Sequence, residues 1–221
     1  MSLNHSPKIV TDGLVMCLDA ANRKSYPGTG TTWFDRSGNS NHGALTNGPT
    51  FSSGNGGSIV FDGTNDCIVV NSNASILSPT AYTKFAWFYP TSFASSNNII
   101  SDGNSGQHAF WLAGGNKLNA GHNGNWGTVV SLTTLSLNTW YCGAVTFNTS
   151  TGWVLYLNGS QEATTNNTTT FNGNGGILIG AYFTGSNVFT GRISTGVVYN
   201  RVLTASEILQ NFNATRGRYG I

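Results

Sequence analysis

The acidic residues of this chain decide first which chemistry it could perform. Cleavage of a glycosidic bond requires two carboxyl groups that flank the bond. The 221 residues include only two glutamates, Glu162 and Glu207, which lie far apart in the sequence. The six aspartates are scattered, and only Asp62 and Asp66 are close together. The sequence therefore argues against a glycosidase built on such a pair, and the spacing of tyrosines and histidines indicates no lyase.

Asp62 and Asp66 are the candidate metal ligands. They flank the segment 63–65, Gly-Thr-Asn, and with backbone carbonyls they could hold calcium, which takes about six to eight oxygen ligands. The alternative is that both carboxylates only stabilise a tight turn by binding its backbone. Zinc is not predicted, because the histidines show no paired ligand spacing: His5, His42, His108 and His122.

The segment 121–128, GHNGNWGT, is the first candidate for binding a sugar. Trp126 lies among glycines and asparagines, outside any clear alternation, as expected for a loop. An exposed indole can stack on a sugar face while the amides of Asn123 and Asn125 bond hydroxyls. The alternative is that Trp126 folds back and caps one end of the protein.

His122 and Tyr182 complete this candidate set. Tyr182 belongs to a second loop, AYFTGSN, which also contains Phe183 and Asn187. The remaining tryptophans lie within strand-like runs, so we expect them in the core: Trp87, Trp111, Trp140 and Trp153.

Antiparallel strands must position these loops. The stretch 139–159 alternates with a period of two, turns at 148–152, and ends in Asn158-Gly159, a strong hairpin signal. Residues 153–157 are apolar on both faces, which indicates a strand covered on both sides. Further strands are predicted at 14–19, 58–62, 67–70, 83–89, 98–101, 107–113, 117–121, 129–132, 161–164, 177–180 and 191–199.

One helix is predicted near the C-terminus, within 204–213. Thr204 and Glu207 have the spacing of a capping box, and apolar residues follow at helical intervals. The chain is predicted to form a single domain, 1–221, with an N-terminal arm at 1–12 and a C-terminal tail at 214–221. Arg216 and Arg218 in this tail are expected in solvent.

The composition indicates where the protein acts and which partners it lacks. Charged residues make up 8% of the chain, against about 25% in typical soluble domains. Such a surface of hydroxyls and amides suits an extracellular or virion protein. The net charge of +2 does not indicate nucleic-acid binding.

Three further features concern processing and redox state. No run of about 20 apolar residues predicts a membrane span. Residues 1–13 lack the apolar core of a signal peptide, which predicts synthesis in a cytoplasm and release by another route, such as lysis. Cys17, Cys67 and Cys142 lie far apart in strand-like runs, so we expect buried, reduced thiols.

Three stretches besides 139–159 resemble a known family. They are GLVMCLDAANRKSYPGTGTTWFDRSGNSNHGAL at 13–45, SIVFDGTNDCIVV at 58–70 and FTGRISTGVVYNRVLTASEI at 189–208. Together they are similar to laminin G-like (concanavalin A-like lectin/glucanase) domains. The resemblance implies an all-β, concanavalin A-like antiparallel β-sandwich, or jelly roll, with one short C-terminal helix.

Two departures from the family pattern bear on its sites. The E-x-D-x-E signature of laminarinase-type enzymes, which share this fold, is absent. Ser194 and Thr195 stand roughly where the family usually has an acidic residue, so a calcium site of the family type is not expected there.

The ending NFNATRGRYGI, 211–221, is similar to tails of tailed-phage structural proteins. These features predict a non-enzymatic virion surface protein, of head-decoration or fibre type, with a lectin-like module. Its expected partners are other virion proteins, further copies of itself and a polysaccharide that aids host adhesion. The alternatives are a bacterial carbohydrate-binding module or adhesin and, less favoured, a glycan-active enzyme.

Overall fold

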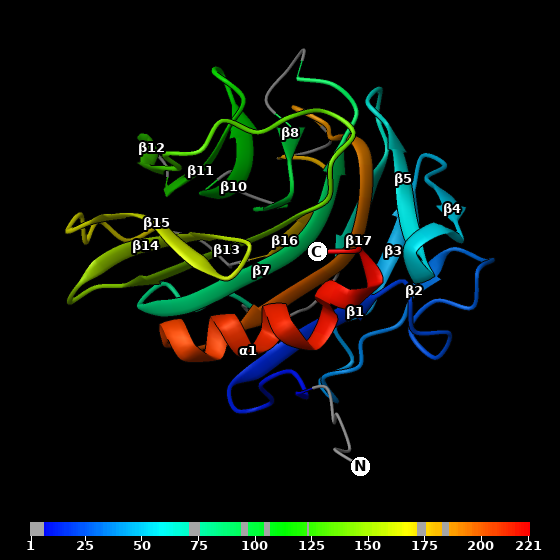
Figure 1. Cartoon of the computed structure of the whole chain (residues 1–221), viewed down its shortest axis with the longest axis horizontal. Coiled ribbons are helices and arrows are strands. Elements are labelled where there is room, and N and C mark those ends of the chain that lie inside the picture. Colours follow the sequence, from blue (N-terminus) through cyan, green and yellow to red (C-terminus); the bar gives the residue numbers. More distant parts are fainter. Residues whose placement is uncertain are drawn as a thin grey trace.

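The computed structural model describes residues 7–70, 76–93, 97–103, 107–122, 124–171, 176–182 and 186–221. The chain folds into antiparallel sheets arranged as a sandwich, with one α-helix near its C-terminal end (Figure 1). This confirms the all-β class, the concanavalin A-like sandwich and the C-terminal helix predicted from the sequence.

One layer of the sandwich is an eight-stranded sheet in the order β15-β14-β13-β7-β17-β5-β4. The long strand β17 bonds to β7 along one edge, and its other edge is shared by β5 and then β1. The strands are β1 Leu14–Asp19, β4 Thr50–Ser52, β5 Ser58–Asp62, β7 Ala81–Pro90, β13 Tyr141–Asn148, β14 Gly152–Leu157, β15 Ser160–Thr165 and β17 Thr190–Tyr199.

Two smaller sheets form the opposite layer. The five-stranded sheet has the order β2-β3-β6-β16-β9, and the four-stranded sheet has the order β12-β11-β10-β8. Their strands are β2 Thr32–Trp33, β3 Gly43–Thr46, β6 Cys67–Val70, β8 Asn97–Asn98, β9 Ile100–Ser101, β10 His108–Ala113, β11 Lys117–His122, β12 Asn125–Val130 and β16 Ile177–Ile179. A 3-10 turn, η1 Gly54–Gly56, joins β4 to β5.

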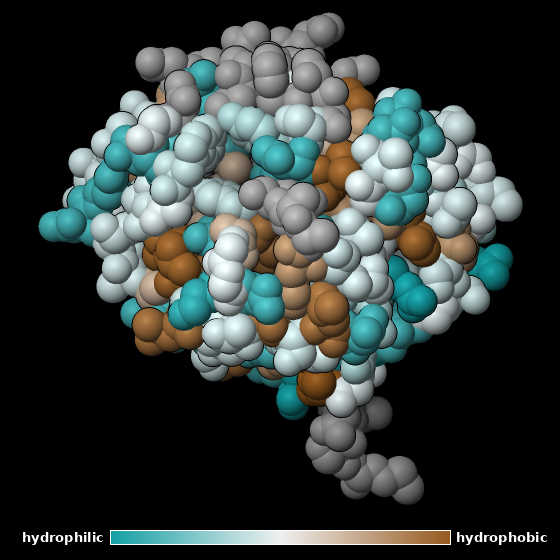
Figure 2. Space-filling view, turned by 90° about the horizontal axis from the view of Figure 1, so that it is seen from above, coloured by the Kyte–Doolittle hydropathy of each residue, from teal (hydrophilic) through white to brown (hydrophobic). Residues whose placement is uncertain are grey.

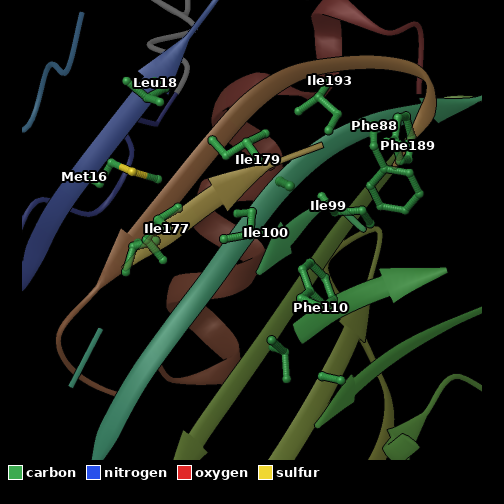
Figure 3. Close-up of a cluster of buried hydrophobic side chains, with 14 of the residues drawn as sticks. Met16, Leu18, Phe88, Ile99, Ile100, Phe110, Ile177, Ile179, Phe189 and Ile193 are labelled. Carbon is green, nitrogen blue, oxygen red and sulfur yellow. The ribbon is translucent and has the colours of Figure 1, made fainter. Parts of the chain in front are cut away.

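The main hydrophobic core lies between the two layers. Alternate side chains of β7, such as Tyr82, Ala86 and Phe88, point into it, as a strand with a period of two requires. Figure 3 shows apolar side chains from β1, β7, β10, β16 and β17 converging on this space. All three sheets contribute to this core, so they pack as one sandwich.

A second core covers the outer face of the eight-stranded sheet. The other side chains of β7, including Phe85 and Trp87, point away from the sandwich and meet α1, Ala205–Thr215. Phe212 of α1 stacks on Trp87 with a centroid distance of 5.7 Å. Figure 1 shows α1 lying across this face, on the side opposite β10–β12. Strand β7 is therefore covered on both faces.

Both ends of the described chain join this second core. The backbone N–H of Val10 donates to Asn211 Oδ1 at 2.8 Å, which fixes the N-terminal arm against α1. Beyond the 3-10 turn η2, Arg216–Arg218, Tyr219 stacks on Trp87 at 3.9 Å, and Arg218 pairs with Asp19 at 2.8 Å. Arg218 is exposed, as predicted, and its guanidinium is held at the surface by this ion pair. The helix also extends two residues beyond the predicted 213.

Most predicted strands are present in the structure, with some differences. The short strand β4 was not predicted, and the strand predicted at 98–101 is two strands, β8 and β9, in different sheets. No strand was predicted within 21–45, but Thr32–Trp33 and Gly43–Thr46 pair there as β2 and β3. The strand predicted at 129–132 instead begins at Asn125. The early start of this strand moves part of the candidate sugar loop into a sheet.

The surface is largely uncharged and polar, with small separate apolar patches (Figure 2). Cys17, Cys67 and Cys142 are free and buried, as predicted. Among the described residues, no helix is long and apolar enough to cross a membrane.

The start of α1 gives a testable consequence. Thr204 and Glu207 form the predicted capping box, and Arg201 adds two bonds to the Glu207 carboxylate, at 2.6 and 3.0 Å. These contacts, Arg201 above all, lower the pKa of Glu207 to about 2. We expect Glu207→Gln to lose about 1–2 kcal/mol of unfolding free energy at neutral pH.

This difference should shrink as the pH falls from 4.5 toward 2, because the wild-type carboxylate then also becomes neutral. Urea unfolding at several pH values measures it, with Glu162→Gln as the control at a glutamate outside the helix. A Glu207→Gln deficit that stays constant down to pH 2 would contradict the ion-pair account.

Candidate functional site

Trp126 stands on the outer face of the four-stranded sheet. Its strand, β12, pairs with β11 through an irregular register between Ala120 and His122. A side chain at Gly121 would clash with the carbonyl oxygen of Asn125, so glycine permits the close approach of the two strands. The glycines of this segment thus serve to place a tryptophan on a sheet. They do not form the free loop that the sequence suggested.

Three aromatic rings meet around Trp126. Its indole lies 6.1 Å from Trp111 of β10 at 84°, and 5.6 Å from Tyr182 at 83°. The two loops that the sequence offered as separate candidates therefore form one site. Trp126 remains 44% exposed, whereas Trp111 is 8% exposed. Trp111 is buried, as expected, and its side chain also forms part of the wall of a surface pocket.

The rings enclose a pocket of about 220 Å³. Its described lining consists of Asn98, Ala109, Trp111, Trp126, Tyr182 and Asn187. Asn187 has a φ of 48° and lies exposed at the rim. The pocket thus combines aromatic walls with two amide side chains and has a small side chain, Ala109, on its surface.

The loop that bears Asn187 is held by the two asparagines of β8. The backbone N–H and Nδ2 of Asn98 both donate to the carbonyl oxygen of Asn187, at 3.3 and 3.1 Å. Asn97 Oδ1 accepts from the backbone N–H of Thr190 at 2.8 Å. Sequence reasoning gave Asn98 no role, although two adjacent amides in a strand otherwise continued by isoleucines were a signal of such a contact.

The other predicted sugar ligands fare differently. Asn125 is exposed and adjoins Trp126 but does not line the pocket. Asn123 and Phe183 lie outside the described residues. His122 does not belong to the surface site, because its side chain is 1% exposed and points into the main core among Tyr82, Phe147 and Trp153.

His122 belongs instead to a network of buried polar groups between the layers. Its Nε2 lies 2.9 Å from the Tyr82 hydroxyl, and its Nδ1 lies 2.7 Å from the carbonyl oxygen of Thr169. Nearby, Lys84 Nζ donates to the carbonyl oxygen of Ile100 at 3.1 Å and lies 2.8 Å from His108 Nδ1. Lys84 and His108 are fully buried.

Burial sets the protonation of these bases. It lowers the pKa of Lys84 from 10.5 to about 7 and the pKa of His122 from 6.5 to about 4. The pKa of His108 is also lowered, first by burial and then by Lys84. Such side chains could act as acids and bases, but these are enclosed in the core and do not line the Trp126 pocket.

Asp62 and Asp66 take part in the turn between β5 and β6. Asp62 Oδ1 accepts from the backbone N–H of Thr64 at 2.7 Å, and Asp66 Oδ2 accepts from that of Asp62 at 3.0 Å. The bond from Thr64 lowers the pKa of Asp62, whereas burial raises the pKa of Asp66. In the described part of the chain, no group of three or more His, Cys, Asp or Glu residues could hold a metal ion. Calcium binding by these two aspartates stays a prediction.

Both glutamates have structural partners away from the pocket. Glu162 accepts from the backbone N–H and hydroxyl of Thr133, at 2.9 and 2.8 Å. Glu207 caps α1. Neither carboxylate lines the Trp126 pocket.

The sequence of the chain matches a family model. Residues 62–209, more than half of the chain, match the model of the concanavalin A-like lectin/glucanases superfamily. The chain belongs to this superfamily, and its resemblance to laminin G-like domains is confirmed. No curated protein sequence matches the chain.

Solved structures share this fold at low sequence identity. Domain 4 of AbnA, a GH43 extracellular arabinanase from Geobacillus stearothermophilus, in complex with arabinotriose, has a TM-score of 0.69 at 18% identity, covering 90% of this chain and 97% of that one. The binding domain of Paraclostridial Mosquitocidal Protein 1 has a TM-score of 0.70 at 21% identity, covering 92% of this chain and 52% of that one.

Trypanosoma rangeli sialidase in complex with sialic acid has a TM-score of 0.68 at 15% identity. The match covers 97% of this chain but only 36% of the sialidase. This chain therefore corresponds to about a third of the sialidase and about half of the mosquitocidal binding domain. At these identities, the likeness shows the fold alone.

The buried bases predict how stability depends on pH. Lys84 and His122 have lower pKa values in the folded protein than in the unfolded chain. The unfolded chain therefore binds more protons as the pH falls, and the free energy of unfolding decreases. Lys84 contributes between pH 10.5 and about 7, and His122 between 6.5 and about 4. We expect Lys84→Met to reduce the change of unfolding free energy with pH between 10.5 and about 7. The change below pH 6.5, which His122 causes, should stay as in wild type.

Urea unfolding across this pH range makes the comparison, with Lys24→Met, at an exposed lysine, as the matched control. Equal slopes for Lys84→Met and wild type above pH 7 would show that Lys84 is not held neutral in the core.

The turn at Asp66 gives a separate prediction. In EDTA, Asp66→Ala should lose about 1 kcal/mol of unfolding free energy, because the N–H of Asp62 loses its acceptor. Asp66→Asn keeps an acceptor oxygen and should stay close to wild type. If calcium binds here, it raises the unfolding temperature of the wild type and not that of Asp66→Asn. If Asp66→Ala had the same unfolding free energy as wild type in EDTA, Asp66 would not stabilise the turn.

Proposed function

We propose that this protein is a non-enzymatic glycan-binding module that holds one sugar ring in the Trp126 pocket. The observation that carries the proposal is Trp126 itself, 44% exposed and perpendicular to both Trp111 and Tyr182. Aromatic faces bind the C–H faces of sugars, and amides such as that of Asn187 bond to hydroxyls.

The size of the pocket supports a small ligand. Its volume of about 220 Å³ is below the about 300–1,000 Å³ of sites for drug-sized molecules. One sugar residue of a longer glycan suits this space. The structural likeness to AbnA domain 4, which was solved with arabinotriose, is consistent with this ligand class and extends over nearly all of that domain.

Two observations favour binding without catalysis. Glycoside hydrolysis needs a pair of carboxyl groups on either side of the bond, and no carboxylate belongs to the described lining of the pocket. The buried acid–base groups, Lys84, His108 and His122, lie inside the sandwich, where a glycan has no access.

The setting proposed for this module is the surface of a virion, as a head-decoration or fibre-type protein beside other virion proteins and copies of itself. The charge-poor surface and the resemblance of residues 211–221 to the C-terminal ends of small tailed-phage structural proteins support this setting. Mass spectrometry of purified particles should then detect the protein. Its absence from particles would favour the alternative, a bacterial carbohydrate-binding module or adhesin.

Replacing the central indole tests the sugar site directly. We expect Trp126→Ala to weaken binding on a glycan array by at least about tenfold, because the stacking surface is lost. Phe34→Ala is the matched control, since Phe34 is also a large exposed aromatic residue, at 41%, but does not line the pocket. Equal glycan binding by wild type and a folded Trp126→Ala protein would contradict a sugar site at Trp126.

A further inference from the structure

The charge of the Trp126 pocket limits which sugars it can take. We propose that this pocket binds uncharged sugars and rejects sugars that carry a carboxylate, such as uronic acids and sialic acid. This inference rests on the sugar-binding function proposed above and narrows it to one ligand class.

The walls of the pocket supply no cation. All six described lining residues are uncharged. The stretches 94–96, 104–106 and 183–185, next in sequence to residues around the pocket, contain no lysine, arginine or histidine either. A carboxylate that leaves water and meets neutral groups alone loses solvation without gaining an ion pair.

Cations on the neighbouring strands are directed elsewhere. Lys84 of β7 points into the core, where it bonds to Ile100. Lys117 lies at the opposite end of β11 from Gly121 and donates to the carbonyl oxygens of Ser131 and Leu132. Arg192 lies over the ring of Tyr89, 5.2 Å from its centroid. None of the three lines the pocket.

The charged group that acts on a residue of this wall is acidic. Asp102 is fully buried, and its Oδ2 accepts from the backbone N–H of Gln107 at 2.9 Å. The pKa of the Tyr182 hydroxyl is raised by burial and, after it, by the charge of Asp102. Tyr182 lines the pocket, so the charge that acts on this wall is negative and offers an anionic ligand no attraction.

The proposal separates this chain from one of the proteins that share its fold. The structure of Trypanosoma rangeli sialidase contains sialic acid. Its likeness to this chain, at 15% identity, shows a shared fold and does not indicate a shared ligand. The chemistry of the pocket in this chain predicts the opposite preference.

Matched pairs of sugars test the proposal on the unmodified protein. Polyvalent conjugates of glucose and glucuronic acid, and of galactose and galacturonic acid, differ within each pair only by a hydroxymethyl or carboxylate group at C6. We expect the neutral member of any pair that binds to bind at least about tenfold more tightly. Its affinity should stay the same when NaCl rises from about 0.05 to about 0.5 M.

A single substitution should weaken this discrimination. Asn187→Lys places an ammonium group at the rim, and we expect it to narrow the difference within a pair by about tenfold. Asn187→Gln is the variant for comparison, because it bears the same strain at a φ of 48° without the charge. Both variants replace the Asn187 amide that lines the pocket, so the two are compared with each other, and only the lysine variant should narrow the difference.

The outcomes distinguish this inference from the proposed function. Equal or tighter binding of the uronic acids by wild type, lost in Trp126→Ala, would overturn the charge preference and leave the sugar site standing. Binding of neither member of any pair by the folded protein would overturn both. If wild type prefers the neutral sugar and Trp126→Ala binds neither member of the pair, both the sugar site and its charge preference are supported.

Discussion

The structure depends on one constraint, which is that its large sheet is apolar on both faces. Strand β7 directs Tyr82 and Phe88 to one side and Phe85 and Trp87 to the other, so neither side can face water. The smaller sheets cover the inner face. The helix α1, the N-terminal arm and the C-terminal tail cover the outer face. These segments are therefore parts of a second core, and the outward face of the four-stranded sheet remains open for a ligand.

The interior also contains groups that a purely apolar core would exclude. Lys84 and His108 are fully buried, and His122 is nearly so. Burial of a base is tolerable when it stays neutral and its polar atoms have partners, which Ile100 supplies to Lys84, and Thr169 and Tyr82 supply to His122. These contacts join β7 to the strands and loops of the opposite layer. They give the packing of the two layers a directional component that apolar contacts lack.

Much of the fold could be predicted from the sequence because its signals are local. Period-two runs, the Asn158-Gly159 turn and the Thr204–Glu207 cap each depend on neighbouring residues. The site was harder to predict, because it joins Trp126 to Tyr182 and Asn98, which are distant in sequence. His122 was misplaced for a related reason. Its direction depends on its strand register, which the glycines around it concealed.

Trp111 illustrates the remaining limit. A tryptophan inside a strand is buried whether it faces a core or the wall of a pocket, and the sequence pattern is the same in both cases. Only the partner decides, and here the partner is Trp126, which arrives from another strand. Asn98 presents a similar difficulty, because its role is to hold a loop that lies about ninety residues further along the chain.

The second core has a practical consequence for how this molecule can be joined to something else. The first described residues and the last ones both pack beside α1, on the layer opposite the Trp126 pocket. A linker joined to the first or last described residues would thus leave from the back of the molecule and keep the pocket facing outward. Tethered in this way to a bead or a sensor chip, many copies would present their pockets in one direction, and weak individual contacts would act together as avidity.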